Sequence, residues 1–304
     1  MAANTVGVQH AMAQIAHNCG DLLTEVITSY ASDTSFVCGR LAETTDDTYN
    51  YGLMRKLGGS TYATISDYVG STKTFTLAGS GIATLSAAGD IVQWFGFNMQ
   101  KRGALFEAVN AAIRDARGTF YREVRDTRAG ASITLAAGTN VYALPTTLGK
   151  LLQVGIQTAT TEGIVWYDPH NIYRVYGQEG AYSIEFMPNY HGTQYAAWSS
   201  RVHLAAAQSY GTFADAFSAQ PLLLRYLTFE PEVTGESDTT QLPLNYLGWV
   251  GANYYSQWLL ANGSDDDRRV LNVHLPQIQA NAARAMSQLS LTKPKLYHTA
   301  QTDW

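Results

Sequence analysis

The sequence predicts an α+β protein, in which a helical bundle is combined with an N-terminal small β unit and a central β-rich domain. In three separated parts of the chain, apolar residues recur at helical spacing. Between these parts, short runs alternate apolar and polar residues and are bounded by Gly, Asp and Ser. The 304 residues include 19 tyrosines and 26 glycines, a composition typical of abundant strand and turn. The two cysteines indicate neither a disulfide framework nor a zinc cluster.

The chain is expected to open with a helix over residues 6–30, within an N-terminal segment 1–30. Its apolar residues follow alternating steps of four and three, which places them on one helix face. They are Val8, Met12, Ile15, Cys19, Leu22 and Val26. No basic residue precedes a hydrophobic run, so a signal peptide is not expected. Residues 31–97 follow as a small β-barrel or β-sheet unit, with β-like runs such as SFVCGRL and GDIVQWFGF.

Residues 98–128 are expected to form a bundle helix. Leu105, Val109 and Ile113 are spaced at i, i+4 and i+8, and Asn98 is a suitable N-cap. This segment holds seven basic and four acidic residues, the one basic cluster of a chain whose net charge is −5. Its arginines could contact phosphate, but a nucleic-acid binder usually has a stronger basic surface. A solvated, salt-bridged surface is the preferred interpretation. The basic residues in question are Arg114, Arg117, Arg122, Arg125 and Arg128, with Glu123 and Asp126 between them.

Residues 129–241 are expected to form the β-rich domain, with a less regular insertion at 189–220, and residues 242–304 a C-terminal helical hairpin and docking tail. The hairpin begins with LPLNYLGWVGANYYSQWLL, which contains no charged residue. Several amide and hydroxyl side chains within it argue against a membrane span. Pro243 suits a first helical turn, Asn262–Gly263 a helix end and Asp265–Asp267 the start of the next helix. The two helices are expected at about 245–262 and 266–289.

The uncharged helix has two possible roles. A helix that is apolar nearly all round is buried on several sides, and interface cores are enriched in Tyr and Trp. A subunit interface is therefore one interpretation, and the central helix of the chain's own core is an equally good one. The predicted interface residues are Tyr246, Trp249, Tyr254, Tyr255 and Trp258, together with Leu105, Val109 and Ile113.

The sequence contains no recognisable catalytic constellation. The spacings of a phosphate-binding loop, a dinucleotide fingerprint, a zinc protease helix and a nucleophile elbow are all missing. Asp168 with His170, followed downstream by His191 and His203, is a weak catalytic candidate. Glu230 and Glu232 could do glycosidase work, but carboxylates beside a proline usually face water. We therefore predict no enzyme, no catalytic residues, no cofactor and no metal site.

Three parts of the chain together resemble a known family. The first is residues 40–95, with RLAETTDDTYN, YGLMRKL and KTFTLAG. The second is the helix ALFEAVNAAIRDAR with a following hairpin that ends in YALP, and the third is the late LPLNYLGWVGANYYSQWLLANGS helix with its successor. This order resembles the head-to-tail adaptor (neck, connector or tail-tubular) proteins of tailed bacteriophages. The matching positions are Ala108, Asn110, Ala111, Arg114 and Asp115; Tyr142, Leu144 and Pro145; and Leu242, Pro243, Gly251, Ala252 and Leu260.

The resemblance implies a virion structural protein that is folded in the host bacterial cytoplasm and located at the neck. It implies a homo-oligomeric ring, commonly a dodecamer, that binds the portal protein and a tail or second neck protein. DNA would pass through its lumen without sequence-specific binding, and no membrane is involved. From their position and apolar character, Leu296, Tyr297 and Trp304 are expected to dock on the portal. The alternatives are another phage tail or decoration component, or a glycan-cleaving enzyme.

Overall fold

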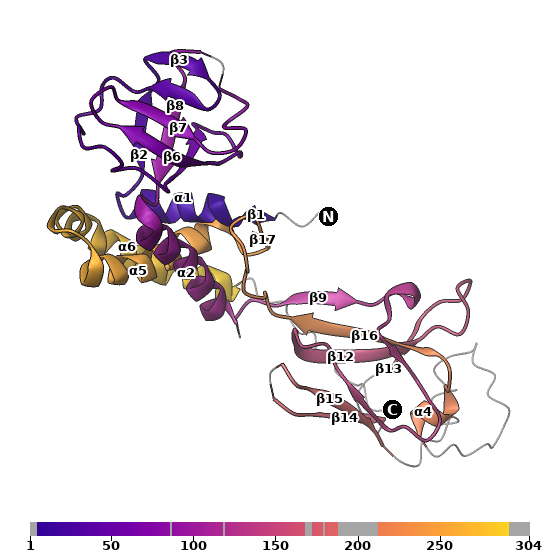
Figure 1. Ribbon diagram of the computed structural model, residues 1–304. Helices are drawn as coiled ribbons and strands as arrows, with labels where there is room; N and C mark the ends of the chain where they lie inside the picture. The colour runs from indigo at the N-terminus through magenta and orange to yellow at the C-terminus, as the bar shows by residue number, and fades with distance from the viewer. Residues whose placement is uncertain are drawn as a thin grey trace. The chain divides into compact units, whose positions relative to one another are not determined.

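The computed structural model describes residues 5–85, 87–117, 119–167, 172–178, 180–187 and 212–291 (Figure 1). Helices and sheets both occur throughout these residues, which confirms the α+β class. The described residues form two compact units. Unit 1 takes those of Met1–Thr119 and Glu232–Lys295, and unit 2 those of Phe120–Pro231. Unit 1 is thus discontinuous in sequence, whereas the sequence patterns predict five consecutive segments.

A rolled β-sheet forms the first part of unit 1 (Figure 1). Its antiparallel strands follow the order β2-β8-β5-β6-β7-β4-β3. The two end strands, β2 and β3, are separated in the chain by only Ile27 and Thr28, so the sheet closes on itself as a barrel and leaves no long free edge. The strands are β2 (Leu23–Val26), β3 (Ser29–Ser32), β4 (Ser35–Val37), β5 (Leu53–Lys56), β6 (Ala63–Val69), β7 (Thr74–Leu77) and β8 (Ile91–Phe95).

Aromatic side chains fill the barrel because alternate strand residues point to its interior. Phe75 and Trp94 are fully buried there, with ring centroids 5.3 Å apart. Tyr49, from the loop before β5, contacts both, at centroid distances of 5.7 and 5.6 Å. Burial raises the pKa of Tyr49 to about 12. The small β unit predicted for residues 31–97 is therefore a barrel with its own core, and it begins earlier than predicted, at β2.

Four helices form the second part of unit 1. They are α1 (Val8–Asn18), α2 (Asn98–Ala116), α5 (Leu244–Asn262) and α6 (Asp265–Leu291). Helix α5 lies among the other three and packs against each of them (Figure 1). Close approach to α1 requires a glycine, because a Cβ at Gly251 would lie 2.4 Å from Cδ1 of Ile15.

The first helix is shorter than the expected range 6–30. It ends at Asn18, and Gly20 follows in the left-handed region with φ of 76°. The amide of Gly20 donates to the carbonyl of His17, and that of Asp21 donates to the carbonyl of Ala16. This pair of bonds is a Schellman motif, which stops a helix at a glycine. Of the residues beyond it expected to continue the helical stripe, Val26 belongs to strand β2 and Leu22 directly precedes that strand.

The second helix also ends early, at Ala116 instead of residue 128. Residues 122–125 form strand β9, which pairs with β16 of unit 2. Pairing with a central strand outweighs the weak helical periodicity of this basic stretch. The start of the helix is as expected, because Oδ1 of Asn98 accepts from the amides of Gln100 and Lys101, both at 3.0 Å.

The expected ends of the C-terminal hairpin are confirmed. Pro243 precedes α5, Gly263 terminates it and Asp265–Asp267 form the first turn of α6. Ser264 and Asp267 add a reciprocal capping box. The Ser264 hydroxyl accepts from the amide of Asp267 at 3.2 Å, and the Asp267 carboxylate accepts from the amide of Ser264 at 2.9 Å.

Unit 2 is built from two antiparallel sheets. In the larger sheet the order is β10-β16-β12-β13, with β9 also paired to β16, and the smaller sheet has the order β11-β15-β14. The strands are β9 (Arg122–Arg125), β10 (Ile133–Thr134), β11 (Val141–Ala143), β12 (Leu148–Ile156), β13 (Val165–Tyr167), β14 (Tyr173–Tyr176), β15 (Ser183–Phe186) and β16 (Pro221–Thr228). The short helix α4 (Phe213–Ala216) contributes Phe213 to the core, where it stacks on Phe186 at 5.2 Å.

The chain re-enters unit 1 at residue 232, so the last ten residues of the expected domain 129–241 belong to the helical part. Asn110 of α2 holds this returning segment. Its side-chain amide donates to the carbonyl of Val233 at 3.1 Å, and its Oδ1 accepts from the amide of Val233 at 2.9 Å. Strand β17 (Thr239–Thr240) then pairs with β1 (Val6–Gly7) at the start of the chain.

Candidate functional site

Five of the eight predicted interface residues lie inside the core of unit 1. Leu105, Val109, Ile113 and Tyr255 have no exposed surface, and Tyr246 is only 3% exposed. Helices α1, α2 and α6 of the same chain cover the sides of α5 on which the tyrosines lie. In this conformation the five residues offer nothing to a second copy, which corrects their expected role. Their apolar character is explained by burial within one chain.

The other three predicted interface residues are partly exposed. Trp258 stacks on Tyr255 with ring planes 7° apart, and Trp249 lies nearer the start of α5. The hydroxyl of Tyr254 donates to Oδ2 of Asp115 on α2 at 2.7 Å. Burial, together with this carboxylate, raises the pKa of Tyr254 to about 12. These three residues belong to the partly exposed, uncharged surface of α5, for which an interface role stays a prediction.

Helix α6 exposes a larger uncharged surface. One stripe packs toward α5 and includes Leu271, Ile278, Ala282, Ala285 and Leu289. The opposite side, here called the α6 outer face, runs along the exposed residues Val273, Pro276, Ala280, Ala283 and Ser287, and the exposed polar residues Gln277 and Arg284 border it. Val273 is 77% exposed, and Arg284 is the only charged residue between positions 270 and 291. Exposed helix faces normally carry polar and charged residues, so this one needs an explanation.

The residues predicted to dock on the portal, Leu296, Tyr297 and Trp304, lie outside the described residues. The same is true of the weak catalytic candidates Asp168, His170, His191 and His203. Their roles therefore stay predictions.

The arginines at the end of α2 are engaged in ion pairs. Arg114 and Arg117 each bind one carboxylate oxygen of Glu232 at 3.0 Å. Arg125, on β9, pairs with Glu123 at 2.7 Å, and the same carboxylate also binds Arg225 at 2.7 Å. This is the salt-bridged arrangement that the alternating charges favour. Glu232 therefore faces two guanidinium groups.

A buried ionic cluster joins the ends of several helices in unit 1. The ammonium of Lys101 lies 3.1 Å from Oδ1 of Asp21 and 2.7 Å from Oδ1 of Asp267. The hydroxyl of Tyr255 donates to Oδ2 of Asp21 at 2.6 Å. Burial raises the pKa of Asp21, although Lys101 and Tyr255 oppose the rise. Burial alone would lower the pKa of Lys101, but the two carboxylates hold it above its usual value.

This cluster is not visible in the sequence pattern. Lys101 is 80 residues from Asp21 and 166 residues from Asp267. Spacing rules report only on neighbours along a helix or strand, so they give no signal for such a contact. Among the described residues no group of three or more His, Cys, Asp or Glu side chains could hold a metal ion.

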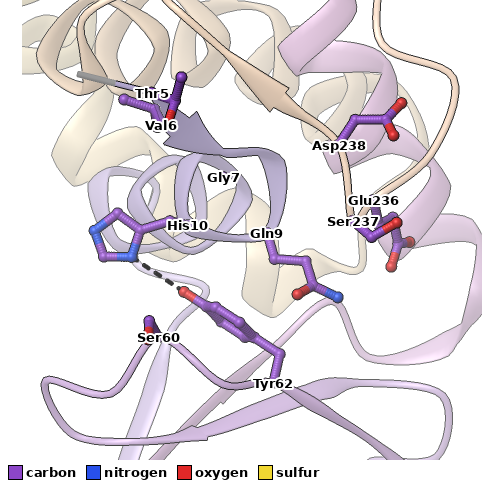
Figure 2. Close-up of a pocket in the computed structure, with 10 residues that line it drawn as sticks. All are labelled: Thr5, Val6, Gly7, Gln9, His10, Ser60, Tyr62, Glu236, Ser237 and Asp238. Atoms are coloured by element: carbon purple, nitrogen blue, oxygen red, sulfur yellow. Dashed lines mark hydrogen bonds between the residues drawn. The ribbon is translucent and has the colours of Figure 1, made fainter. Parts of the chain in front are cut away.

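An open pocket of about 410 Å³ lies within unit 1, between the start of α1, the loop before β6 and the loop before β17 (Figure 2). Its lining consists of Thr5, Val6, Gly7, Gln9, His10, Ser60, Tyr62, Glu236, Ser237 and Asp238. Figure 2 shows His10 and Tyr62 turned toward one another across the space between α1 and the barrel loop. Glu236 on the other side forms a bidentate pair with Arg102, at 2.8 and 2.7 Å.

No model of a known protein family matches this sequence, and no significantly similar curated protein was found. In the part of the chain that the structure describes, none of the helices combines the length and apolar character that a membrane span requires.

Proposed function

We propose that this protein is a subunit of the head-to-tail adaptor ring of a tailed bacteriophage. The observation that supports the proposal best is the α6 outer face, a long, exposed and nearly uncharged helix surface on a unit whose core is already complete. Small residues such as Ala280 and Ala283 allow another helix to approach closely. A second copy of the chain is the partner that a ring would place there.

In this proposal α1, α2, α5 and α6 form the helical bundle at the core of the ring. The α6 outer face contacts the neighbouring copy, and the β units remain available for other virion proteins. The net charge of −5 suits a channel through which DNA slides without sticking. The ring docks under the portal protein and provides the attachment surface for the tail. The protein acts mechanically and carries no catalytic site.

The first experiment is size-exclusion chromatography with light scattering, followed by negative-stain microscopy, on the purified chain with and without a cognate portal. Closed rings with a central hole are expected, with twelve copies when the portal is present. Val273→Asp should prevent ring formation, because it places an unpaired charge within the contact at its most exposed apolar residue. Ser71→Asp adds the same charge at an exposed barrel turn and should leave rings intact. Rings that form equally well with Val273→Asp would exclude this contact surface.

The portal contact is tested separately by deleting residues 292–304, which follow α6 directly. We expect the truncated protein to fold and to lose binding to the portal in a pull-down assay. Unchanged binding would remove Leu296, Tyr297 and Trp304 from the docking site. Copy number in the particle distinguishes the remaining alternatives, because a neck ring has about a dozen copies whereas a decoration protein covers the shell.

A further inference from the structure

His10 connects helix α1 to the barrel through a set of contacts that requires a neutral imidazole. Its Nδ1 lies 3.0 Å from Nη1 of Arg55 on β5 and 3.2 Å from the hydroxyl of Tyr62 in the loop before β6. Nη1 of Arg55 also donates to that hydroxyl at 2.8 Å. The three polar groups thus form a triangle between two parts of unit 1 (Figure 2).

The donor and acceptor roles in this triangle are determined by arginine. A guanidinium group only donates hydrogen bonds and stays protonated, so Nδ1 of His10 must be the acceptor. The Tyr62 oxygen accepts from Arg55. The single lone pair of Nδ1 accepts from Arg55, or is shared between Arg55 and the Tyr62 hydroxyl, and in either case the imidazole carries its single proton on Nε2.

Protonation of His10 would turn Nδ1 from a hydrogen-bond acceptor into a donor. A proton on Nδ1 removes the acceptor for Arg55 and places a second positive charge 3.0 Å from Nη1 of Arg55, whereas the Tyr62 hydroxyl could accept from the new N–H. Burial, and secondly the charge of Arg55, lower the pKa of His10, in agreement with this geometry.

The other charged groups near His10 cannot compensate a positive imidazole. Glu236 and Asp238 line the same pocket. The negative charge of Glu236 is already balanced by Arg102, with which it forms a bidentate ion pair. The Asp238 carboxylate accepts hydrogen bonds from the amides of Thr234 and Gly235, both at 2.8 Å. Neither carboxylate is hydrogen-bonded to His10.

Arg55 and Tyr62 are each fixed to the barrel by further contacts. Protonation of His10 would therefore weaken the contact between α1 and the barrel, here called the junction, and leave the barrel itself unchanged. Nε of Arg55 donates to the side chain of Gln93 on β8 at 3.1 Å. The ring of Tyr62 packs edge-on against Phe95 of the same strand, at a centroid distance of 6.1 Å. We propose that His10 is a proton-controlled latch, which holds the barrel against α1 when neutral and releases it when protonated.

The test begins with the wild-type 304-residue chain labelled on histidine nitrogen and carbon. NMR at about pH 7.5 should show His10 with its proton on Nε2, and titration should give a pKa below that of a free histidine. A proton on Nδ1 at this pH, or a pKa above the free value, would overturn the proposal. This measurement needs no variant, so it does not depend on any substitution folding.

Opening of the junction is measured by hydrogen exchange with mass spectrometry on peptides that cover residues 5–14 and 53–65. After normalisation for intrinsic rates, exchange should be several-fold faster at about pH 5 than at about pH 7.5. At a pH well below the His10 pKa of both the open and the closed junction, the fraction of open molecules rises about tenfold for each unit by which closing lowers that pKa. The increase should disappear in His10→Gln and persist in His17→Gln, which changes an exposed histidine on the same helix. An equal increase in His10→Gln would contradict the latch.

Discussion

The contact between α1 and α5 predicts that Gly251→Ala destabilises unit 1. The added Cβ would lie 2.4 Å from Cδ1 and 2.9 Å from Cγ1 of Ile15, and 3.4 Å from the carbonyl oxygen of Ala108. Unstrained carbon contacts lie at about 3.5–4.0 Å, so Ile15 must move by about 1 Å. Ile15 is fully buried, and a β-branched residue in a helix has essentially one χ1 rotamer, so Cγ1 cannot rotate away and Cδ1 can turn about χ2 only into packed surroundings.

The magnitude follows from two opposing effects. Overpacking of a well-filled core costs about 1–3 kcal/mol. Replacing a helical glycine by alanine recovers about 1 kcal/mol of helix propensity. Gly103→Ala isolates the second effect, because Gly103 is an exposed residue of α2 and its added Cβ would meet no atom within 4 Å. We therefore expect Gly103→Ala to stabilise unit 1, and Gly251→Ala to be about 1–3 kcal/mol less stable than Gly103→Ala.

The assay must report on unit 1 alone, because a chain with two units does not unfold in one two-state step. Urea unfolding followed by hydrogen exchange on peptides of α1 and α5 meets this requirement. The midpoint for Gly251→Ala should be lower than that for Gly103→Ala, with unchanged cooperativity. Equal midpoints would show that α1 and α5 are not packed as closely as described, and the reasoning would be refuted.

Three further predictions concern the helix ends and the ionic cluster. Ser264→Ala removes half of the capping box and should destabilise unit 1 by about 1 kcal/mol, measured by the same urea assay, whereas an unchanged midpoint would argue against the cap. Lys101→Met leaves Asp21 and Asp267 buried without a cation and should cost about 3–5 kcal/mol, and adding Asp21→Asn should restore part of this in a double-mutant cycle. The folded-state pKa values of Lys101 and Tyr255 are raised, so their contributions are complete below about pH 10 and are lost as the pH rises further. Unfolding midpoints should therefore fall above about pH 10, and a flat profile up to about pH 12 would contradict this.

The sequence predicts local features of this fold well. The ends of the C-terminal hairpin follow from Pro243, Asn262–Gly263 and Asp265–Asp267, because capping depends on residues within one turn of a helix end. The early end of α1 is predictable on the same basis, since Gly20 is a good helix terminator. The stripe of apolar residues continues past this glycine by coincidence, so periodicity alone extends the helix too far.

Features that depend on distant residues are not predictable in this way. Barrel closure requires β2 and β3 to pair with β8 and β4, and nothing in the pattern of either short strand specifies its partner. The polar contacts are unpredictable for the same reason, because their partners are far apart in the sequence. Asn110 binds Val233 across 123 residues, and His10 meets Tyr62 across 52. These histidine and asparagine side chains are ordinary helix residues until the fold brings their partners to them.

The two helices of the hairpin show that an uncharged sequence has more than one physical cause. Most of helix α5 lacks charge because three helices of its own chain pack against it, so this part of its composition needs no second copy. The α6 outer face lacks charge although the chain leaves it exposed, so the absence of charge there requires another explanation. For this reason Val273→Asp tests the proposed ring contact more directly than a change at Trp249. If the partly exposed surface of α5 formed the contact instead, Trp249→Gln would prevent ring assembly and Val273→Asp would not.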